Sequence, residues 1–424
     1  MRITRHELSG ADLGELAARL RSMVPATEDV SAVVAEILAR VRSGGDAALR
    51  EIATELGEEP GEELAVDPET IAIAPALLET DVREGLAFAA RNIGEVAAAE
   101  LEAALTPVDV ELEQGQRVSV VSSPVRSVGI YAPGGSAAYP SSVLMCALPA
   151  RAAGAARVCL VSPPGASGKP GDAVLAACAM AGVDEVYSLG GAQAIAALAY
   201  GTDSVAAVDL IVGPGNRFVT EAKRQVSGAV GIDALAGPSE LFVVADGAAD
   251  PSLIALDVLA QAEHGDDSPL VVVSPDTALL DRVGELVEAM AAERPSVADA
   301  PLGLVLAPGI ELALSLADAF APEHLELAFE AAHEAARGRV AGCVFVGPAA
   351  ATAFGDYAAG SNHVLPTGGA ARFGGPLGPG AFLRRASIVS IPSAAAGQLA
   401  PHVDAVARAE GFPVHGESAA ARTG

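Results

Sequence analysis

Short apolar runs alternate with helical patterns along most of the chain, and this alternation restricts the fold more than any other feature of the sequence. The runs are rich in Val, Leu and Ile and end in Gly or Pro, as in RVCLVSPPG (157–165) and VDLIVGPGN (208–216). Helical patterns such as GDAVLAACAMAG (171–182) and RFVTEAKRQVSG (217–228) lie between them. Short buried strands joined by helices form parallel sheets with both faces covered. The sequence therefore predicts two α/β units in tandem, the second starting near residue 250.

The flanking segments have other patterns. Residues 1–60 have apolar residues at helical spacing with a Gly-Gly break at 44–45, and residues 70–105 continue as amphipathic helix. Alternating β-branched residues from about residue 118 predict strands. After Arg385 we expect a short strand and a small helical tail.

Composition excludes several classes of function. With 424 residues the chain is long enough for two or three domains, and since it has no Trp and only 4% aromatic residues, its core must consist of Ala, Val, Leu and Ile. A net charge of −28 argues against nonspecific binding to nucleic acid or to anionic membranes. The N-terminus has no apolar signal segment. The four cysteines indicate reduced, buried thiols and a cytoplasmic protein: Cys146, Cys159, Cys178 and Cys343.

Four Gly/Pro-rich turns follow predicted strands, where open α/β sheets bind their ligands. They are YAPGG (131–135), LGGAQ (189–193), VGPGN (212–216) and AGPSE (236–240). Any one alone is more often a plain tight turn. Together they favour a nucleotide-sized ligand, with Tyr131, Gln193 and Asn216 as polar contacts. The sequence has neither the G-x-G-x-x-G fingerprint nor a P-loop, so a dinucleotide would bind in an unconventional way.

Nitrogen and carboxylate donors of the kind that suits zinc occur in three separate segments. Gln261 and His264 lie three residues apart in LAQAEHGDDSP, and residues three apart in a helix share a face. Asp356 and His363 lie in the segment 354–369, and Glu410 and His415 lie in the tail. An ordinary helix end is the alternative interpretation of the first pair, and the spacing alone is weak evidence for a metal site.

Glu323 and His324 are neighbours in APEHLEL, directly after a proline. Adjacent residues of a helix diverge by about 100°, so joint action favours a loop or a helix start. A carboxylate beside an imidazole can perform general acid/base chemistry near neutral pH. The alternative is a solvent-exposed helix cap with no chemical role.

Taken together, these motifs resemble those of the histidinol dehydrogenase family, in the family's order and over roughly residues 125–415. The segments that carry the resemblance are YAPGG, GGAQAIAALAYGT, GPGNRFVTEAKRQV, AGPSE, AQAEHGDDSP, APEHLEL, GDYAAGSNHVLPTGGAARF and FLRR. The resemblance implies a zinc- and NAD-dependent oxidoreductase that converts L-histidinol to L-histidine through L-histidinaldehyde, using two NAD. It also implies one zinc per subunit and an intertwined homodimer in which the tail completes the partner's site.

The resemblance assigns roles to residues of this sequence. The implied zinc ligands are Gln261, His264, Asp356 and His415. The implied catalytic pair is Glu323 and His324, and the implied NAD contacts are Tyr131, Gln193 and Asn216. The implied substrate contacts are Ser239, Gln261, His264, His324, Asp356, His363, Glu410 and His415. The tail departs mildly from the family pattern in EGFPVHGES, with Phe412 and Pro413 where a looser, more polar spacer is expected.

The implied fold is α/β, with two tandem, incomplete Rossmann-like parallel-sheet domains plus a small N-terminal helical segment and a C-terminal tail. The expected boundaries are an N-terminal helical segment at 1–26, a first α/β domain with the zinc and catalytic residues at 27–125 and 237–385, a second α/β domain with the NAD contacts at 126–236, and a dimer-crossing tail at 386–424.

Two other functions fit the same donors. A zinc hydrolase would use the Glu323–His324 pair with metal-activated water and would need no NAD. A catalytically idle relative would bind ligand without turnover. The turns at residues 131, 193 and 216 favour the dinucleotide enzyme, and formation of NADH only with histidinol and NAD together separates the three.

Overall fold

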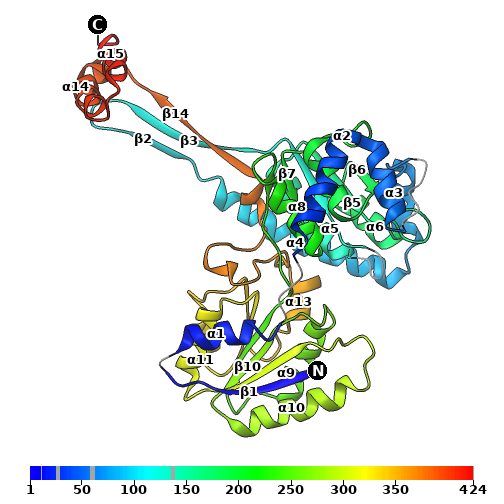
Figure 1. Cartoon of the computed structure of the whole chain (residues 1–424). Helices are drawn as coiled ribbons and strands as arrows, with labels where there is room; N and C mark the ends of the chain where they lie inside the picture. Colours follow the sequence, from blue (N-terminus) through cyan, green and yellow to red (C-terminus); the bar gives the residue numbers. More distant parts are fainter. Residues whose placement is uncertain (11, 25–28, 58–62, 135–138, 424) are drawn as a thin grey trace.

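The chain forms two α/β units and a long arm that ends in a pair of helices (Figure 1). The structure is a computed structural model and describes residues 1–10, 12–24, 29–57, 63–134 and 139–423. Each unit is built on one parallel sheet. The predicted fold class, with two tandem incomplete Rossmann-like domains, is confirmed.

One sheet, sheet B, comes from the middle of the chain and has the order β6-β5-β4-β7-β8. Its strands are β4 (Ser127–Tyr131), β5 (Arg157–Ser162), β6 (Glu185–Ser188), β7 (Leu210–Val212) and β8 (Gly231–Ile232). The connecting helices are α5 (Pro140–Ala153), α6 (Asp172–Ala181), α7 (Gly191–Tyr200) and α8 (Arg217–Val226). The first strand of this sheet along the chain, β4, lies in the centre. Successive strands are added on one side of it up to β6 and on the other side from β7, so the strand order reverses between β4 and β7. This is the Rossmann strand order without its sixth strand.

The other sheet, sheet A, has the same central order with one strand added at the edge, β1-β11-β10-β9-β12-β13. Its strands are β1 (Arg2–Glu7), β9 (Leu241–Ala245), β10 (Leu270–Ser274), β11 (Pro301–Leu306), β12 (His324–Ala328) and β13 (Cys343–Val346). Its helices are α1 (Leu13–Arg21), α9 (Pro251–Ala262), α10 (Thr277–Ala291), α11 (Ile310–Phe320), α12 (Ala332–Ala335) and α13 (Thr352–Tyr357). Here the reversal falls between β9 and β12.

Two strands of sheet A differ from the sequence-based expectation. Residues 2–7 were expected to be helical but form β1, which pairs in parallel with β11. RITRHE is mostly polar because β1 is an edge strand with an exposed face, so it lacks the apolar run of a central strand. The segment HLELA was not expected to be a strand either, but it forms the fully buried β12.

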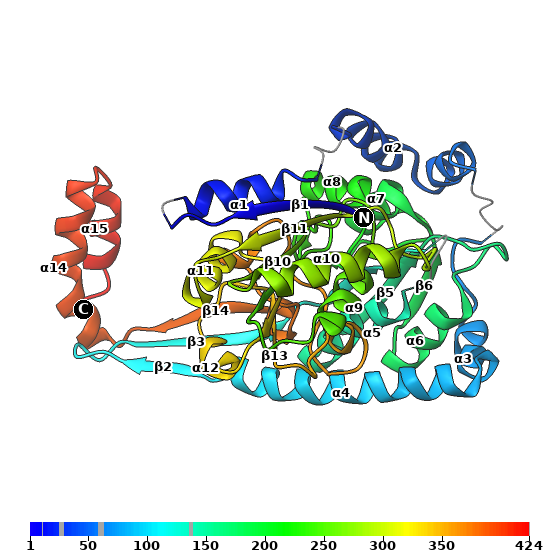
Figure 2. The same cartoon turned by 90° about the horizontal axis from the view of Figure 1, so that it is seen from below.

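Three N-terminal helices cover sheet B rather than sheet A. They are α2 (Ser31–Glu55), α3 (Pro68–Leu77) and α4 (Thr80–Ala104), and they pack against α7, α6 and α5 respectively. Figure 2 shows α2 on one side of this unit and α4 on the other. The expected break within α2 is present, since Gly45 has a positive φ of 53°. The expected grouping of residues 27–125 with residues 237–385 therefore differs from the observed packing.

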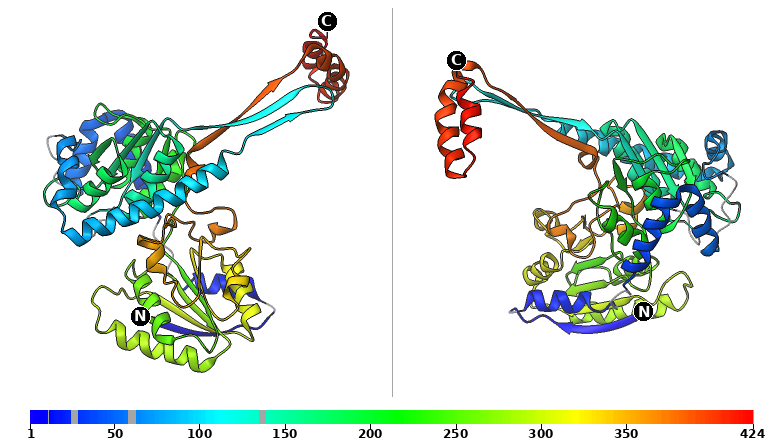
Figure 3. Two further views of the ribbon diagram at one scale, coloured as in Figure 1. Left: turned by 180° about the vertical axis from the view of Figure 1, so that it is seen from behind. Right: turned by 45° about the horizontal axis from the view of Figure 1, so that its top comes forward.

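The arm is an antiparallel sheet of β2 (Val108–Glu111), β3 (Arg117–Pro124) and β14 (Leu383–Ser390), in the order β14-β3-β2. It extends away from both units and carries α14 (Ser393–Ala409) and α15 (Pro413–Ala420) at its tip (Figure 3). The short helices η1 (Ala370–Arg372) and η2 (Pro379–Phe382) precede β14. The arm and its tip expose several large apolar side chains: Ile388, Val389, Ile391, Val406, Phe412 and Val414.

The core has the expected composition. Buried Val, Leu, Ile and Ala side chains fill both faces of sheet B and both faces of sheet A. Burial of such side chains contributes about 1.5–3 kcal/mol each for the larger ones. In the described part of the chain, no helix is both long enough and apolar enough to cross a membrane.

Candidate functional site

The Glu323–His324 pair lies where the strand order of sheet A reverses, at the amino ends of the neighbouring strands β9 and β12. The chain leaves α11, turns sharply at Ala321 and enters β12 at His324. Ala321 has a φ of 50° and is the only described non-glycine residue with a positive φ, a conformation that costs free energy and is retained mainly at functional turns. The two residues are 6% and 2% exposed. The pair is therefore a buried loop-to-strand junction, and the alternative of an exposed helix cap is wrong.

The position of this pair corrects one assumption. Ligands of open α/β sheets usually bind at the carboxyl ends of the strands, and the AGPSE turn was expected to act there. The turn does follow β8 of sheet B, but its Ser239 and Glu240 directly precede β9. In sheet A the polar residues thus gather at the amino edge, next to the chain that joins the two units.

The carboxylate of Glu323 is held by two donors on one oxygen. Its Oε2 accepts from the Ser239 hydroxyl at 2.6 Å and from the Glu240 amide nitrogen at 2.8 Å. Because the Ser239 hydrogen goes to Glu323, its oxygen accepts from Gln261 Nε2 at 2.5 Å. This bond fixes the orientation of the Gln261 amide and turns its Oε1 away from Ser239.

His324 lies between two carboxylates. Its Nδ1 lies 3.4 Å from Glu323 Oε2 and 3.0 Å from the Glu240 carbonyl oxygen, and its Nε2 lies 3.6 Å from Asp356 Oδ1. Burial alone would lower the pKa of His324, but the carboxylates of Glu323 and Asp356 outweigh it and raise the pKa well above its usual range. The two carboxylates therefore stabilise the protonated form of the His324 ring.

Asp356 and His363 join the site from the segment after β13. Asp356 belongs to α13, close enough to His264 for their charges to interact. His363 Nδ1 donates to the Asp356 carbonyl oxygen at 2.8 Å, so its Nε2 accepts from the Ser142 hydroxyl of α5 at 3.1 Å. Burial lowers the pKa of His363, which keeps the ring neutral. His363 thereby joins the site of sheet A to a helix of sheet B.

Gln261 and His264 were expected to share one face of a helix, but they do not. Gln261 is in the last turn of α9, whereas His264 follows the helix end at Ala262 and donates its backbone N–H to the Gln261 carbonyl oxygen. Gln261 is 1% exposed and His264 is exposed. The pair is thus a helix end, and its two side chains meet the site from a tight turn.

Two predicted site residues are not brought to this place within one chain. Glu410 ends α14 and His415 lies in α15, both at the tip of the arm, far from the two units (Figures 1 and 3). There they border a cavity of about 520 Å³ whose other walls include the apolar side chains Val403, Val406 and Phe412. The His415 ring packs on the Phe412 ring, with centroids 5.5 Å apart.

The residues near Asp356 fit a metal ion. Gln261 Oε1 is buried and has no hydrogen-bond partner, and a buried polar atom without a partner is costly unless a ligand completes it. An amide oxygen, an imidazole and a carboxylate from Gln261, His264 and Asp356 are suitable zinc donors. Within the described residues, no three His, Cys, Asp or Glu side chains form a metal cluster.

The predicted NAD contacts lie along the carboxyl edge of sheet B. The Tyr131 hydroxyl at the end of β4 accepts from the Gly191 amide nitrogen at 3.2 Å, and Asn216 caps α8 by accepting from the amide nitrogens of Phe218 and Val219. Gln193 is fully buried, and both of its amide atoms are without partners. Gly135 of the first turn lies outside the described residues.

The glycines of these turns are needed for close packing. Gly213 has a φ of 107°, and a side chain there would overlap the Tyr131 carbonyl oxygen. The buried ammonium of Lys223 pairs with Asp233 and donates to the Gly213 carbonyl oxygen at 3.0 Å, while Asp233 accepts from the Gly213 amide nitrogen at 2.7 Å. The second turn leads into the N-terminus of α7, where backbone N–H groups favour an anion such as a phosphate.

Sequence reasoning missed three residues of the site: Arg21, Ser142 and Glu240. Glu240 was visible in AGPSE but was not singled out. Arg21 and Glu240 are 219 residues apart in the sequence and come into contact only in the folded chain. Ser142 and His363 are likewise 221 residues apart. No local pattern in a single sequence indicates either contact.

Comparisons with known proteins agree on one family. The family model described as histidinol dehydrogenase matches residues 21–423. Histidinol dehydrogenase from Rhodospirillum rubrum is 45% identical over 429 residues, which cover 99% of this chain and 98% of that protein. The enzyme from Gluconobacter oxydans is 43% identical and covers 93% of each chain. The crystal structure of histidinol dehydrogenase from Elizabethkingia anophelis superposes with a TM-score of 0.91 at 30% identity, covering 100% of this chain and 98% of that one.

Proposed function

The chain belongs to the histidinol dehydrogenase family of histidine biosynthesis, and we propose that it oxidises L-histidinol to L-histidine through L-histidinaldehyde with zinc and two NAD. One observation supports this most. The buried Glu323–His324 pair connects through Ser239 to the unsatisfied Gln261 oxygen and through its own imidazole to Asp356. An acid/base pair thereby adjoins a set of metal donors.

In this proposal zinc is held by Gln261, His264 and Asp356 of one chain and by His415 of the partner subunit. When bound, zinc supplies a positive charge that orients the nitrogen atoms of histidinol and polarises the reacting oxygen. Ser239, His363 and Glu410 contact the substrate. The neutral His363 uses its Nδ1–H on the Asp356 carbonyl oxygen and its Nε2 on the Ser142 hydroxyl, so a substrate donor would replace Ser142 at Nε2.

His324 acts in the first oxidation. The hydroxyl proton of histidinol passes to the His324 ring while a hydride passes to NAD from the carbon that bears the hydroxyl group. The ring is suited to this role because the neighbouring carboxylates stabilise its protonated form. Tyr131, Gln193 and Asn216 hold NAD along the carboxyl edge of sheet B, facing the loop that carries His363.

Glu323 acts in the second oxidation. Both hydrogen bonds that its carboxylate makes to described residues go to Oε2, so Oε1 can take a proton from water as the water attacks the aldehyde. The resulting hydrate gives up a hydride to a second NAD and becomes the carboxylic acid. The burial of the pair limits access of bulk water and keeps the reactive aldehyde bound between the steps.

We propose that the active form is a homodimer whose arms cross. The tip of the arm exposes apolar side chains, and Glu410 and His415 border a cavity there rather than joining the other site residues of the same chain. A crossing arm would place both next to the partner's Gln261, His264 and Asp356. The strongly acidic charge and the free cysteines, of which Cys146, Cys159 and Cys178 are buried and Cys343 is partly buried, suit a cytoplasmic enzyme that binds neither nucleic acid nor membrane.

A spectrophotometric assay with and without metal tests the proposed function. We expect NADH absorbance only when L-histidinol and NAD are both present, and loss of that signal after chelation with recovery on adding zinc. Elemental analysis should find about one zinc per chain, in line with a single donor set. Histidinol turnover without NAD, or full activity after complete removal of metal, would contradict the proposal.

A further inference from the structure

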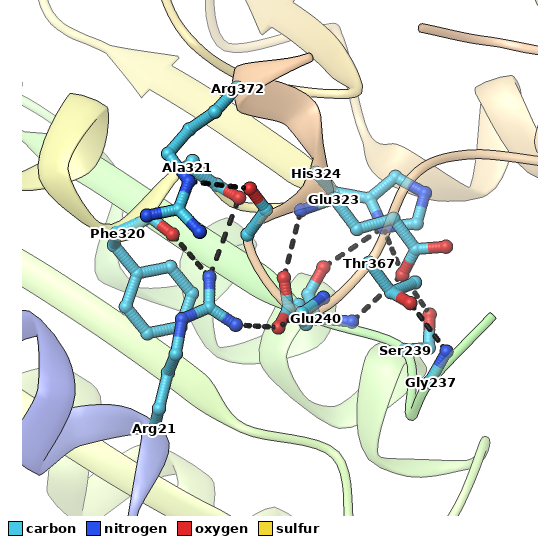
Figure 4. A network of polar contacts seen from close by, with 12 residues as sticks. Arg21, Gly237, Ser239, Glu240, Phe320, Ala321, Glu323, His324, Thr367 and Arg372 are labelled. Atoms are coloured by element: carbon cyan, nitrogen blue, oxygen red, sulfur yellow. Dashed lines mark hydrogen bonds and ion pairs between the residues drawn. The ribbon is translucent and has the colours of Figure 1, made fainter. Parts of the chain in front are cut away.

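The N-terminal helix α1 contributes an arginine to the network around Glu323 and His324 (Figure 4). Arg21 is the last residue of α1, and its Nη1 lies 2.5 Å from Glu240 Oε1. Its side chain is 26% exposed, whereas that of Glu240 is 3% exposed. The pair therefore joins a partly accessible guanidinium to a carboxylate inside the site.

Glu240 contacts both proposed catalytic residues. Its backbone carbonyl oxygen accepts from the His324 amide nitrogen at 3.2 Å and lies 3.0 Å from His324 Nδ1. Its Oε2 accepts from the Glu323 amide nitrogen at 3.2 Å, and its own amide nitrogen donates to Glu323 Oε2 at 2.8 Å. Its Oε1 also accepts from the Gly368 amide nitrogen at 3.1 Å. Glu240 thus fixes the backbone and the side-chain orientation of the pair.

Arg21 also holds the strained turn before the pair. Its Nη2 donates to the carbonyl oxygens of Phe320 and Ala321, and its guanidinium carbon lies 4.0 Å from the centre of the Phe320 ring. These carbonyls end α11, where the helix itself provides no donor. The positive φ of Ala321 needs such support, because the chain would otherwise relax toward an ordinary helix end.

We infer that Arg21 and Glu240 are positioning residues for the reaction, which fix the Ala321 turn and thereby the places of Glu323 and His324. This inference rests on the proposed roles of that pair. Arg21 acts from outside the site, through Glu240 and the turn, and touches neither substrate nor cofactor. The N-terminal helix is therefore part of the catalytic framework rather than only a cover for sheet A.

The experiment compares Arg21→Ala, Arg21→Lys and Glu240→Gln with Arg19→Ala, an exposed arginine of the same helix. We expect kcat of Arg21→Ala to fall about 10²-fold, the effect of displacing a catalytic group by about 1 Å, while zinc content and the KM for histidinol stay near normal. Arg21→Lys keeps the positive charge but loses the planar guanidinium group, so its kcat should lie between those of Arg21→Ala and the unchanged protein. Arg19→Ala should be unaffected.

The pH profile distinguishes positioning from a general loss of structure. Burial raises the pKa of Glu240 and the Arg21 guanidinium opposes that rise, in surroundings that include the charged or titratable groups of Glu323, His324 and Arg372. Removing Arg21 therefore raises this pKa further. The carboxylate form is lost as pH falls through the pKa, so the acid limb of kcat for Arg21→Ala should move to higher pH. Glu240→Gln has no such group and should lose kcat without this displacement.

Added guanidinium at low millimolar concentration should restore part of the Arg21→Ala activity, because the vacated place is open to solvent. Arg21→Lys and this rescue keep the test decisive if Arg21→Ala folds poorly. Normal kcat in Arg21→Ala, or a loss that comes with lost zinc and shows neither a displaced limb nor rescue, would overturn the inference. If His324→Asn also keeps full turnover in the same assay, the proposed function has failed; if His324→Asn is inactive, the inference alone has failed.

Discussion

A dimer assembled from one His264→Asn chain and one His415→Asn chain regains about half of the normal activity, although each variant alone is inactive. In a crossed dimer, one site collects both lesions and the other has neither, so two-fold symmetry leaves one intact site of two. Each homodimer has one lesion in every site. Loss of one zinc ligand of four should lower the zinc content of both variants without unfolding them.

The test uses two affinity tags, one on each variant chain. The two variants are unfolded and refolded together, the doubly tagged dimer is isolated, and NADH formation is measured. If the arms fold back on their own chain, every site of the mixed dimer keeps one lesion and no activity returns.

The reciprocal dimer is a matched control. It pairs an unchanged chain with a chain that carries both His264→Asn and His415→Asn. With crossed arms both of its sites have one lesion and it is inactive, whereas arms that act on their own chain leave one site intact and half of the activity. Activity in the reciprocal dimer together with inactivity in the first would refute the crossed arrangement.

Glu323→Gln should separate the two oxidations. An amide cannot take a proton from water, so oxidation of added L-histidinaldehyde should fall about 10²- to 10⁴-fold, the usual contribution of a general base. Oxidation of histidinol to the aldehyde should fall less. The amide still fills the place of the carboxylate and can meet the Ser239 hydroxyl, so the site should keep its shape.

His324→Asn should give the opposite order, with the alcohol oxidation impaired at least as strongly as the aldehyde oxidation. Single-turnover measurements of NADH from each substrate provide both rates. Since loss of His324 also removes a neighbour of Asp356, zinc content is measured in both variants. Equal, mild effects of Glu323→Gln on the two half-reactions would argue against water activation by Glu323.

The repeating part of the fold could be predicted from the sequence because its strands are buried on both faces. Runs such as the one around Leu160 are continuously apolar and end in Gly or Pro, so length and flanking turns identify them. β1 was not predicted because an edge strand with exposed polar residues has no such apolar run. β12 was not predicted because HLELA has ionisable residues, His324 and Glu326, in place of a continuous apolar run and directly follows a helix and a proline.

Contacts between distant segments could not be predicted. The order of strands in each sheet, the packing of α2 to α4 on sheet B, and the Arg21–Glu240 pair depend on which surfaces meet after folding. A helix near a strand in the sequence need not pack on it, and this is why residues 27–125 were grouped with the wrong sheet. Local motifs did indicate Gln261, His264, Glu323 and His324, but not that His264 lies beyond the end of its helix.

The count of NADH per histidinol tests the central claim most directly. L-Histidinol, in limiting amount, is consumed completely by zinc-loaded enzyme with excess NAD, and NADH and L-histidine are both quantified. An alcohol becomes an acid by the loss of two hydrides, so the account predicts two NADH and one L-histidine for each histidinol. One NADH for each histidinol with free aldehyde accumulating, or consumption of histidinol without NADH, would contradict it.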